Sequence, residues 1–224
     1  MLQQFYDRAD AGKQLAAQLT AYANRPDVVV LALPRGGVPV AFEVASTLHA
    51  PLDIMVVSKL GAPGQEELAL GALASGGVRV INEDVVSMLG ISDEMIDEIA
   101  TRKQHELERR ERLYRDYRPV PPIRGRTVIL IDDGLATGAT MLAAIAAVKQ
   151  QQPARVIVAV PVAAAATYDE FTQQGIEMVC VLKPELFYAV GIWYEQFSQT
   201  SDEEVRDLLA QAAHEQSAWL QKRS

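Results

Sequence analysis

Two adjacent carboxylates, Asp132 and Asp133, stand between an apolar run and a loop of small residues and threonines. The apolar run, 128–131, is rich in β-branched residues and predicts a strand that is buried on both faces. The loop that follows the acids is Gly134, Leu135, Ala136, Thr137, Gly138, Ala139 and Thr140. An alanine-rich stretch over 141–148 then favours a helix. Because backbone N–H groups and the helix dipole converge on such a loop, and threonine hydroxyls can donate to an anion, the sequence predicts a phosphate site.

The kind of phosphate follows from what the loop lacks and from the acids before it. No Lys stands beside Gly138, as the nucleoside-triphosphate loop requires, and the dinucleotide pattern Gly-x-Gly-x-x-Gly is absent from the loop. Two carboxylates facing a phosphate would repel it, so we expect them to face a neutral, hydroxylated group beside it. A ribose 5-phosphate meets both conditions, with Asp132 and Asp133 accepting hydrogen bonds from the 2- and 3-hydroxyls. The alternative is a surface turn with one Asp as helix cap, which needs neither the second acid nor two threonines.

The segment Asp-Asp-Gly-Leu-Ala-Thr-Gly-Ala-Thr, 132–140, resembles the signature of the type I phosphoribosyltransferases, and it is closest to the adenine and orotate branches. The resemblance implies transfer of a 5-phosphoribosyl group from phosphoribosyl diphosphate to a nitrogen heterocycle, a nucleobase-like acceptor, with release of pyrophosphate. It also implies that Mg²⁺ is carried by the substrate, with no metal held directly by the protein. The hypoxanthine-guanine branch has an aspartate where Ala136 stands, which disfavours a 6-oxopurine and leaves the acceptor base open.

A second strand-loop-helix unit carries a cation beside glycines. The run 28–33 predicts a buried strand, Arg35, Gly36 and Gly37 follow it, and a helix is expected over 39–48. A guanidinium can bridge phosphate oxygens, and glycines let backbone amides face an anion. The segment resembles the pyrophosphate loop of the same family, which often contains a non-proline cis peptide bond. The alternative is a turn whose Arg projects into water.

The next predicted strand, 52–57, is followed by Lys59 and a flexible run over 60–64. Two short strands over 68–74 and 78–81, separated by Ser-Gly-Gly, then predict a hairpin. In the resembled family the segment after this strand is a mobile loop that closes over the reacting centre and excludes water. By that resemblance Lys59 is a candidate for stabilising the departing pyrophosphate, and a solvated lysine at a strand end is the equal alternative.

The stretch 82–118 is strongly charged and fits none of the common salvage enzymes well. Ser92 and the acids after it predict the start of a helix, and glutamates stand four residues before arginines along it. We expect a long, exposed helix that braces the fold or mediates dimerisation. Residues 102–126 hold nine of the 21 Lys and Arg, which could face a phosphorylated substrate or a partner. A solvated face that its own glutamates neutralise is the favoured interpretation.

Aromatic residues make up only 6% of the chain, and several gather between the last predicted strand and the C-terminal helix. This stretch resembles the part of the purine phosphoribosyltransferases in which a ring stacks on the base and backbone groups read its edge. Phe187 matches the stacking position, and Val190 and Gly191 match the backbone readers. The alternative places these aromatics in the core or a dimer interface, and it is favoured for Trp193 and Tyr194.

Strands and helices alternate along the chain, with further strands predicted over 155–160 and 176–182 and a helix between them. This alternation predicts an α/β fold, a doubly wound and mostly parallel sheet flanked by helices. The expected organisation is one domain over 1–224, made of a core at about 26–182, a β-hairpin flap at 59–81, a helical insertion at 82–118, and a small hood with the C-terminal helix at 183–224.

Composition excludes several classes of protein. The net charge of −8 argues against general nucleic-acid binding, and no apolar run approaches the roughly 20 residues that span a membrane. Cys180 is the only cysteine, so no internal disulfide is possible, and the cytoplasm is the expected compartment. The three histidines lack the spacing of metal ligands. The charged helix and the aromatic tail lead us to expect a homodimer.

The sequence therefore predicts an enzyme, a phosphoribosyltransferase. Asp132 and Asp133 would fix the ribose and favour positive charge beside it, while Arg35 and Lys59 would neutralise the leaving group. The alternative is a non-catalytic or regulatory protein of the same fold that binds a nucleotide or phosphoribosyl diphosphate. A third option, a hydrolase with an aspartate nucleophile, needs a metal-binding carboxylate elsewhere, for which the sequence offers no convincing candidate.

Overall fold

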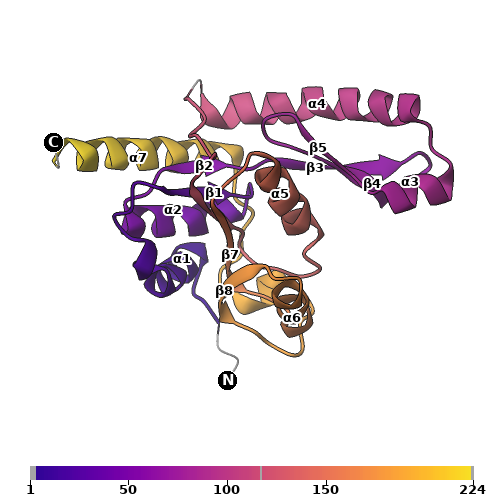
Figure 1. Cartoon of the computed structure of the whole chain (residues 1–224). Helices are drawn as coiled ribbons and strands as arrows, with labels where there is room; N and C mark the ends of the chain where they lie inside the picture. Colours follow the sequence, from indigo (N-terminus) through magenta and orange to yellow (C-terminus); the bar gives the residue numbers. More distant parts are fainter. Residues whose placement is uncertain (1–3, 117, 223–224) are drawn as a thin grey trace.

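The computed structural model describes residues 4–116 and 118–222 of the chain, with the backbone alone described for 66–69. A five-stranded sheet lies at its centre, in the order β2-β1-β6-β7-β8, and every pair of neighbouring strands is parallel (Figure 1). The strands are β1 Val28–Ala32, β2 Leu52–Ile54, β6 Thr127–Ile131, β7 Arg155–Val162 and β8 Glu177–Leu182. The predicted parallel α/β sheet is confirmed. Its central strands β1 and β6 are buried at every position, as continuous apolar runs predict.

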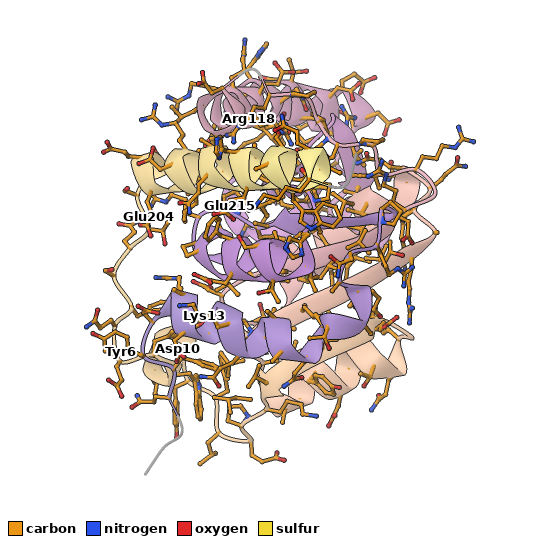
Figure 2. All side chains as sticks on the ribbon, turned by 90° about the vertical axis from the view of Figure 1, so that its left-hand side faces the viewer. Tyr6, Asp10, Lys13, Arg118, Glu204 and Glu215 are labelled. Carbon is orange, nitrogen blue, oxygen red and sulfur yellow. The ribbon has the colours of Figure 1, made fainter. Side chains whose placement is uncertain are left out.

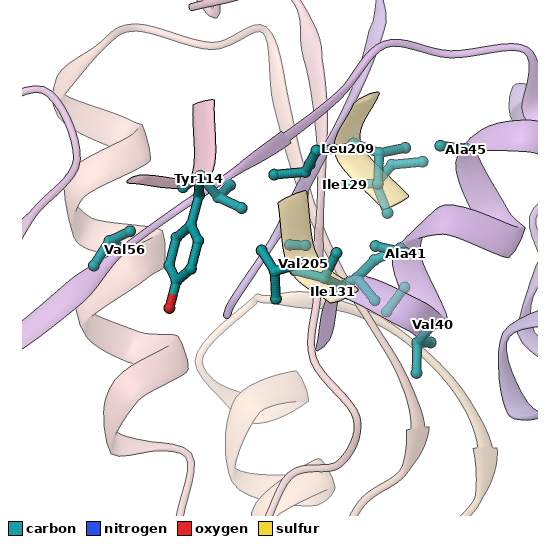
Figure 3. Packing of buried hydrophobic residues seen from close by; sticks show 14 of the residues in the cluster. Val40, Ala41, Ala45, Val56, Tyr114, Ile129, Ile131, Val205 and Leu209 are labelled. Atoms are coloured by element: carbon teal, nitrogen blue, oxygen red, sulfur yellow. The ribbon is translucent and has the colours of Figure 1, made fainter. Parts of the chain in front are cut away.

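Helices cover both faces of this sheet. They are α1 Arg8–Gln18, α2 Gly37–Leu48 and α7 Asp202–Gln221 on one face, and α5 Ala139–Gln150 and α6 Ala165–Gln173 on the other. Side chains of β6 alternate between the two layers, so that Ile129 and Ile131 face α2 and α7 while Val128 and Leu130 face α5. Figure 3 shows the first layer, where Ile129 and Ile131 meet residues of α2 and α7. Figure 2 shows α1, α2, α7 and a further helix, α4 (Asp93–Arg115), stacked in that order along one side.

A second, three-stranded antiparallel sheet extends to one side of the main sheet (Figure 1). Its strands are β3 Val57–Ala62, β4 Gln65–Ala74 and β5 Val78–Ile81, and the predicted hairpin between β4 and β5 is confirmed. The prediction of one strand over 52–57 is wrong, because β2 ends at Ile54 and the chain then leaves the main sheet. Of the flexible run expected over 60–64, residues 60–62 belong to β3, whose backbone groups pair with β4, and residues 63 and 64 form the turn that follows. Lys59 lies in β3 opposite Ala72.

The charged stretch forms two helices, α3 Glu83–Leu89 and α4 Asp93–Arg115. Ser92 caps α4 by accepting a hydrogen bond from the Met95 backbone N–H at 3.3 Å, as predicted. The apolar stripe of α4 is buried against the small sheet and α7, so the helix is exposed on one side only. Short 3₁₀ turns occur at Thr20–Tyr22 and Val190–Trp193. No described helix has both the length and the apolar character needed to cross a membrane.

Arg115 fixes the end of α4 to the edge of the main sheet. Its Nε lies 2.9 and 3.0 Å from the two carboxylate oxygens of Asp53 in β2, and one terminal nitrogen donates to the Ile54 carbonyl oxygen at 3.0 Å. Another donates to Glu111 at 2.9 Å. Burial raises the pKa of Asp53, and the charge of Arg115 opposes that rise. The charge of Arg115 therefore offsets part of the cost of burying this carboxylate, and the contacts hold α4 in place.

Replacing Arg115 by Met should leave Asp53 buried without its cation. We expect the free energy of unfolding to fall by about 3 kcal/mol, measured by urea denaturation at neutral pH. Arg112→Met is the matched control, because Arg112 is 73% exposed and lies 3.8 Å from Glu108 on the solvent side of the same helix. An equal loss in both variants would contradict the anchoring role of Arg115.

Candidate active site

The carboxyl ends of β1 and β6 bring the two predicted loops together. The backbone N–H of Leu33 donates to the Ile131 carbonyl oxygen at 2.8 Å, so the chain leaving β1 runs beside the chain leaving β6. A Cβ on Gly36 would collide with the Asp133 carboxylate, and one on Gly37 would lie 2.7 Å from the Ile131 carbonyl oxygen. Because only glycine permits this approach, the glycines place the Arg35 loop directly against the paired acids.

The loop after β1 has the backbone form that the resemblance implied, since the peptide bond between Pro34 and Arg35 is cis. Arg35 itself faces α7, with a terminal nitrogen 3.5 Å from the Asp202 carboxylate. The phenol of Tyr114 on α4 donates to the same carboxylate at 2.7 Å. Burial and that carboxylate raise the pKa of Tyr114 to about 12, so the phenol stays protonated. The loop after β1, α4 and α7 are thus joined at the Asp202 carboxylate.

The paired acids at the end of β6 are largely withdrawn from solvent. Asp132 accepts a hydrogen bond from the Asp133 backbone N–H at 2.8 Å, and Asp133 accepts one from Arg8 Nε at 2.9 Å. Burial, followed by the charge of Asp133, raises the pKa of Asp132 well above its ordinary value. Burial also raises the pKa of Asp133, while Arg8 opposes that rise. Across the described part of the chain, no group donates to the second oxygen of either carboxylate, so both can still accept from a ligand.

Two side chains that the sequence did not place in the site hold these acids. Arg8 of α1 lies 3.9 Å over the Phe197 ring and donates to the Ser198 carbonyl oxygen at 2.6 Å. Tyr194 donates its hydroxyl to the Asp133 backbone carbonyl. Tyr194 is also buried, so the core alternative that was favoured for it is confirmed. No motif marks Arg8, and Tyr194 belongs to the aromatic stretch after β8. Both reach the acids from segments distant in the sequence.

Arg8→Gln should remove the cation that opposes the rise in the pKa of Asp133. Because the carboxylate must be ionised to accept sugar hydroxyls best, we expect the pH of half-maximal ribose 5-phosphate binding to move upward by about one unit. Calorimetric titrations between pH 4 and 8 measure this midpoint. Lys13→Gln, at an exposed position of α1, is the control. If the midpoint for Arg8→Gln equals that of the wild-type protein, Arg8 does not control the pKa of Asp133.

The loop 134–140 combines buried residues with an exposed rim. Leu135 is buried, and its backbone N–H donates to the Val162 carbonyl oxygen at 2.8 Å. Gly138 caps α5 with a positive φ of 77°. Ala136, Thr137, Ala139 and Thr140 are the residues of the rim. The helix N-terminus and the two threonine hydroxyls therefore border solvent, where an anion can reach them.

Two cavities meet at Thr140, which lines both. One, of about 390 Å³, contains Arg35, and the other, of about 600 Å³, contains Lys59 together with residues of the small sheet and α5. Val57 also borders both. Arg35 and Lys59 thus line adjoining cavities rather than one, and Lys59 projects from a strand of the small sheet.

The aromatic segment after β8 contacts the loop of the paired acids. A Cβ on Gly134 would lie 2.5 Å from the Val190 side chain, and one on Gly191 would lie 2.8 Å from the Phe197 ring. Phe187 is half-buried and packs at 20° to the Trp193 ring, with 6.4 Å between centroids. Trp193 is buried, in agreement with the core alternative. The base-binding roles of Phe187, Val190 and Gly191 stay predictions.

Within residues 4–116 and 118–222, no three His, Cys, Asp or Glu side chains are grouped so as to hold a metal ion. The carboxylates of the site, Asp132 and Asp133, instead contact the Asp133 backbone N–H and Arg8. Oxygen donors of this kind suit Mg²⁺ when a substrate supplies the remaining ligands. The expectation that Mg²⁺ arrives with the substrate stays a prediction.

A parallel α/β sheet with a glycine loop at one strand end and a paired-acid, threonine-rich loop at the next defines the class of open α/β domains whose ligands bind at the carboxyl edge of the sheet. Comparison with known proteins names the family. Residues 1–179 match the model of the phosphoribosyl transferase domain family. The chain belongs to that family.

Relatives agree with this assignment. The chain is 46% identical over 208 residues to the Mycobacterium tuberculosis H37Rv protein named "Putative phosphoribosyl transferase Rv0571c", covering 93% of this chain and 47% of that protein. It therefore spans about half the length of the curated relatives that it matches. The crystal structure of TT1426 from Thermus thermophilus superposes with a TM-score of 0.82 at 41% identity, over 93% of this chain and 98% of that one. A hypothetical protein from Neisseria gonorrhoeae, solved with bound ppGpp, shares the fold at a TM-score of 0.50 and 14% identity, over 94% of this chain and 98% of that one.

Proposed function

We propose that the protein transfers the 5-phosphoribosyl group of phosphoribosyl diphosphate to a nitrogen heterocycle and releases pyrophosphate. The observation that carries the proposal is the contact between two loops. Gly36 and Gly37 place the Arg35 loop against Asp132 and Asp133 at the carboxyl edge of the sheet. One side of that contact is cationic and the other is acidic, which suits a substrate with a diphosphate at one end of a hydroxylated sugar.

The phosphate loop would hold the 5-phosphate. The Thr137 and Thr140 hydroxyls on its exposed rim and the first backbone N–H groups of α5 are donors, and the helix dipole favours the anion. Asp132 and Asp133 would accept hydrogen bonds from the ribose 2- and 3-hydroxyls. These hydroxyls supply donors to two carboxylates that burial otherwise penalises, as the direction of both pKa shifts indicates.

In the reaction the bond between ribose C1 and the diphosphate oxygen breaks, and its electron pair leaves with pyrophosphate. The acceptor nitrogen then forms a bond to C1 and gives up its proton. Positive charge develops on the sugar between these events, so the carboxylates of Asp132 and Asp133 stabilise it, while Arg35 and Lys59 offset negative charge on the leaving group. Catalysis of this kind depends on positioning and on charge placement.

The remaining parts of the proposal concern the metal and the acceptor. Mg²⁺ would enter on the diphosphate and sugar hydroxyls, where it neutralises charge on the leaving group. A flat heterocycle would lie against the segment after β8, with Phe187 as the stacking ring and Val190 and Gly191 as backbone readers. The contact between Gly134 and Val190 supports this side for the base, because it brings that segment to the ribose end of the site.

The test combines binding and turnover. Calorimetry with phosphoribosyl diphosphate, ribose 5-phosphate and unphosphorylated ribose, each with Mg²⁺, should give binding of the two phosphorylated compounds only. Labelled phosphoribosyl diphosphate with a panel of purines, pyrimidines and other nitrogen heterocycles should then yield a ribosylated product and pyrophosphate. Binding without transfer to any acceptor would favour the regulatory alternative and reject the enzyme. Absence of binding would reject the site itself.

A further inference from the structure

The cavity beside the pyrophosphate loop is walled by the inserted helix α4. It encloses about 390 Å³, and its lining comes from the loop after β1, from residues 55–57 after β2, from α4, and from the two ends where α5 and α7 begin. The polar and charged side chains among its lining are Arg35, Arg109, Arg110, Tyr114, Thr140 and Asp202. Three guanidinium groups from two separate segments therefore border one space, and Thr140 of the phosphate loop borders it too.

The lining of this cavity carries more positive than negative side chains. Asp202 is the only carboxylate in its described lining, and that carboxylate already accepts from Tyr114 and pairs with Arg35 at 3.5 Å. Arg110 lies 3.3 Å from Glu106 one turn away. The guanidinium of Arg109 forms no ion pair or hydrogen bond with any residue that the structure describes. An anion in the cavity would supply the partner that Arg109 lacks.

The backbone that carries the two arginines is fixed rather than loose. Positions 109, 110, 113 and 114 lie on one side of α4 by helical spacing, and all four line the cavity. Tyr114 is buried and hydrogen-bonded to Asp202, and Arg115 is bound to Asp53 at the sheet edge. These contacts flank Arg109 and Arg110 on the C-terminal side and hold them over the pyrophosphate loop.

We propose that Arg109 and Arg110 of α4 bind the diphosphate of phosphoribosyl diphosphate and the pyrophosphate that leaves, together with Arg35. The inference rests on the proposed function and extends it, because it makes the charged insertion part of the leaving-group site. Guanidinium groups form bidentate hydrogen bonds with phosphate oxygens, and three of them can together bind an anion with two phosphate groups. When the diphosphate binds, it replaces Asp202 as the partner of Arg35.

The charged side chains around this cavity also favour an anion with several negative charges. A further cavity of about 450 Å³ adjoins the first and shares Arg110 and Val57 with it. It also contains Lys59, Arg102 and Lys103, with Glu106 as its one carboxylate in the described lining, so an excess of positive charge continues along α4 and β3. In a protein whose net charge is −8, this local excess of cations attracts a polyanion to one edge of the sheet.

Calorimetry on the intact chain tests the inference, with Mg²⁺ present and with three ligands: phosphoribosyl diphosphate, inorganic pyrophosphate and ribose 5-phosphate. We expect Arg109→Ala and Arg110→Ala each to weaken binding of the two diphosphates about tenfold, and the double variant more. Ribose 5-phosphate lacks the diphosphate, so its affinity should change less than about twofold. Arg112→Ala is the matched control, since its 73% exposed side chain lies on the solvent side of α4 beside Glu108.

The outcomes separate the inference from the function on which it rests. If the wild-type protein binds all three ligands and the double variant binds them equally well, the inference is overturned and the proposed function stands. If the double variant loses ribose 5-phosphate and its melting temperature falls, the arginines are structural and the inference is also overturned. If the wild-type protein binds none of the three, the proposed function itself fails. Arg109→Lys and Arg110→Lys keep the charge but cannot form bidentate hydrogen bonds, so they should give intermediate affinities for the two diphosphates.

Discussion

Asp132→Asn is expected to lower kcat/KM for phosphoribosyl transfer by about 100- to 1000-fold, because it removes a carboxylate from beside the developing cation. The same change should stabilise the unliganded protein, by on the order of 1 kcal/mol at neutral pH. Asparagine keeps an oxygen to accept from the Asp133 backbone N–H, so the local hydrogen bond survives. Opposite effects on activity and stability are the expected signature of a residue kept for function.

The pH dependence follows from the raised pKa of Asp132. Between the ordinary pKa of an aspartate and this raised value, the folded chain binds more protons than the unfolded chain, so the free energy of unfolding falls as pH rises. The Asn variant should lose that part of the fall, and denaturation curves between pH 4 and 8 measure it. Asp27→Asn, at the opposite end of β1 and paired with Arg25, is the control for activity. Unchanged kcat/KM in Asp132→Asn would contradict the role of the acid.

Gly138→Ala should have the largest effect on the phosphate loop. The residue caps α5 with a φ of 77°, and an added Cβ would lie 2.6 Å from the ring of Phe171, which is fully buried. We expect a loss of about 2 to 4 kcal/mol in the free energy of unfolding, from the left-handed backbone and from overpacking. Ribose 5-phosphate affinity should fall at least about tenfold, because the first turn of α5 must shift.

Gly175→Ala separates the two causes. Gly175 has a similar φ of 74°, but nothing lies within 4 Å of an added Cβ there. The free energy of unfolding of Gly175→Ala should fall only by the backbone contribution, about 1 kcal/mol, and ribose 5-phosphate binding should stay unchanged. Urea denaturation and calorimetry on both variants make the comparison. Equal losses of stability would show that contact with Phe171 does not constrain the loop.

Local pattern was enough to predict the two loops, each at the carboxyl end of a strand. Each glycine loop follows a continuous apolar run, and the carboxyl ends of neighbouring parallel strands share one edge of a sheet. The contact of Gly36 with Asp133 follows from that rule once β1 and β6 pair. Strand pairing itself was inferred only as a class of fold, since periodicity says which face is buried and not which strand lies alongside.

What the sequence could not predict lies in contacts between distant segments. Arg8 reaches Asp133 across 125 positions of sequence, and no motif marks it. The apolar run 52–57 continues past Ile54, where the strand changes sheets, and an apolar pattern alone does not show where a strand changes its partner.

The charges of α4 illustrate the same limit. The i,i+4 spacing of glutamates and arginines suggested a solvated face that neutralises itself, and Arg110, Arg112 and Arg115 do approach glutamates one turn away. Arg109 and Arg110 nevertheless line the cavity of Arg35, because the anchored end of α4 turns that part of the helix toward the site. Spacing within a helix gives neighbours along it, whereas tertiary packing decides which side faces a ligand.

The most direct test of the central claim is a crystal structure of the protein with ribose 5-phosphate. We predict the phosphate against the threonines on the rim of the loop 134–140, and a carboxylate oxygen of both Asp132 and Asp133 within about 3.2 Å of a ribose hydroxyl. A sugar bound elsewhere, or bound with both carboxylates turned away from its hydroxyls, would contradict the account.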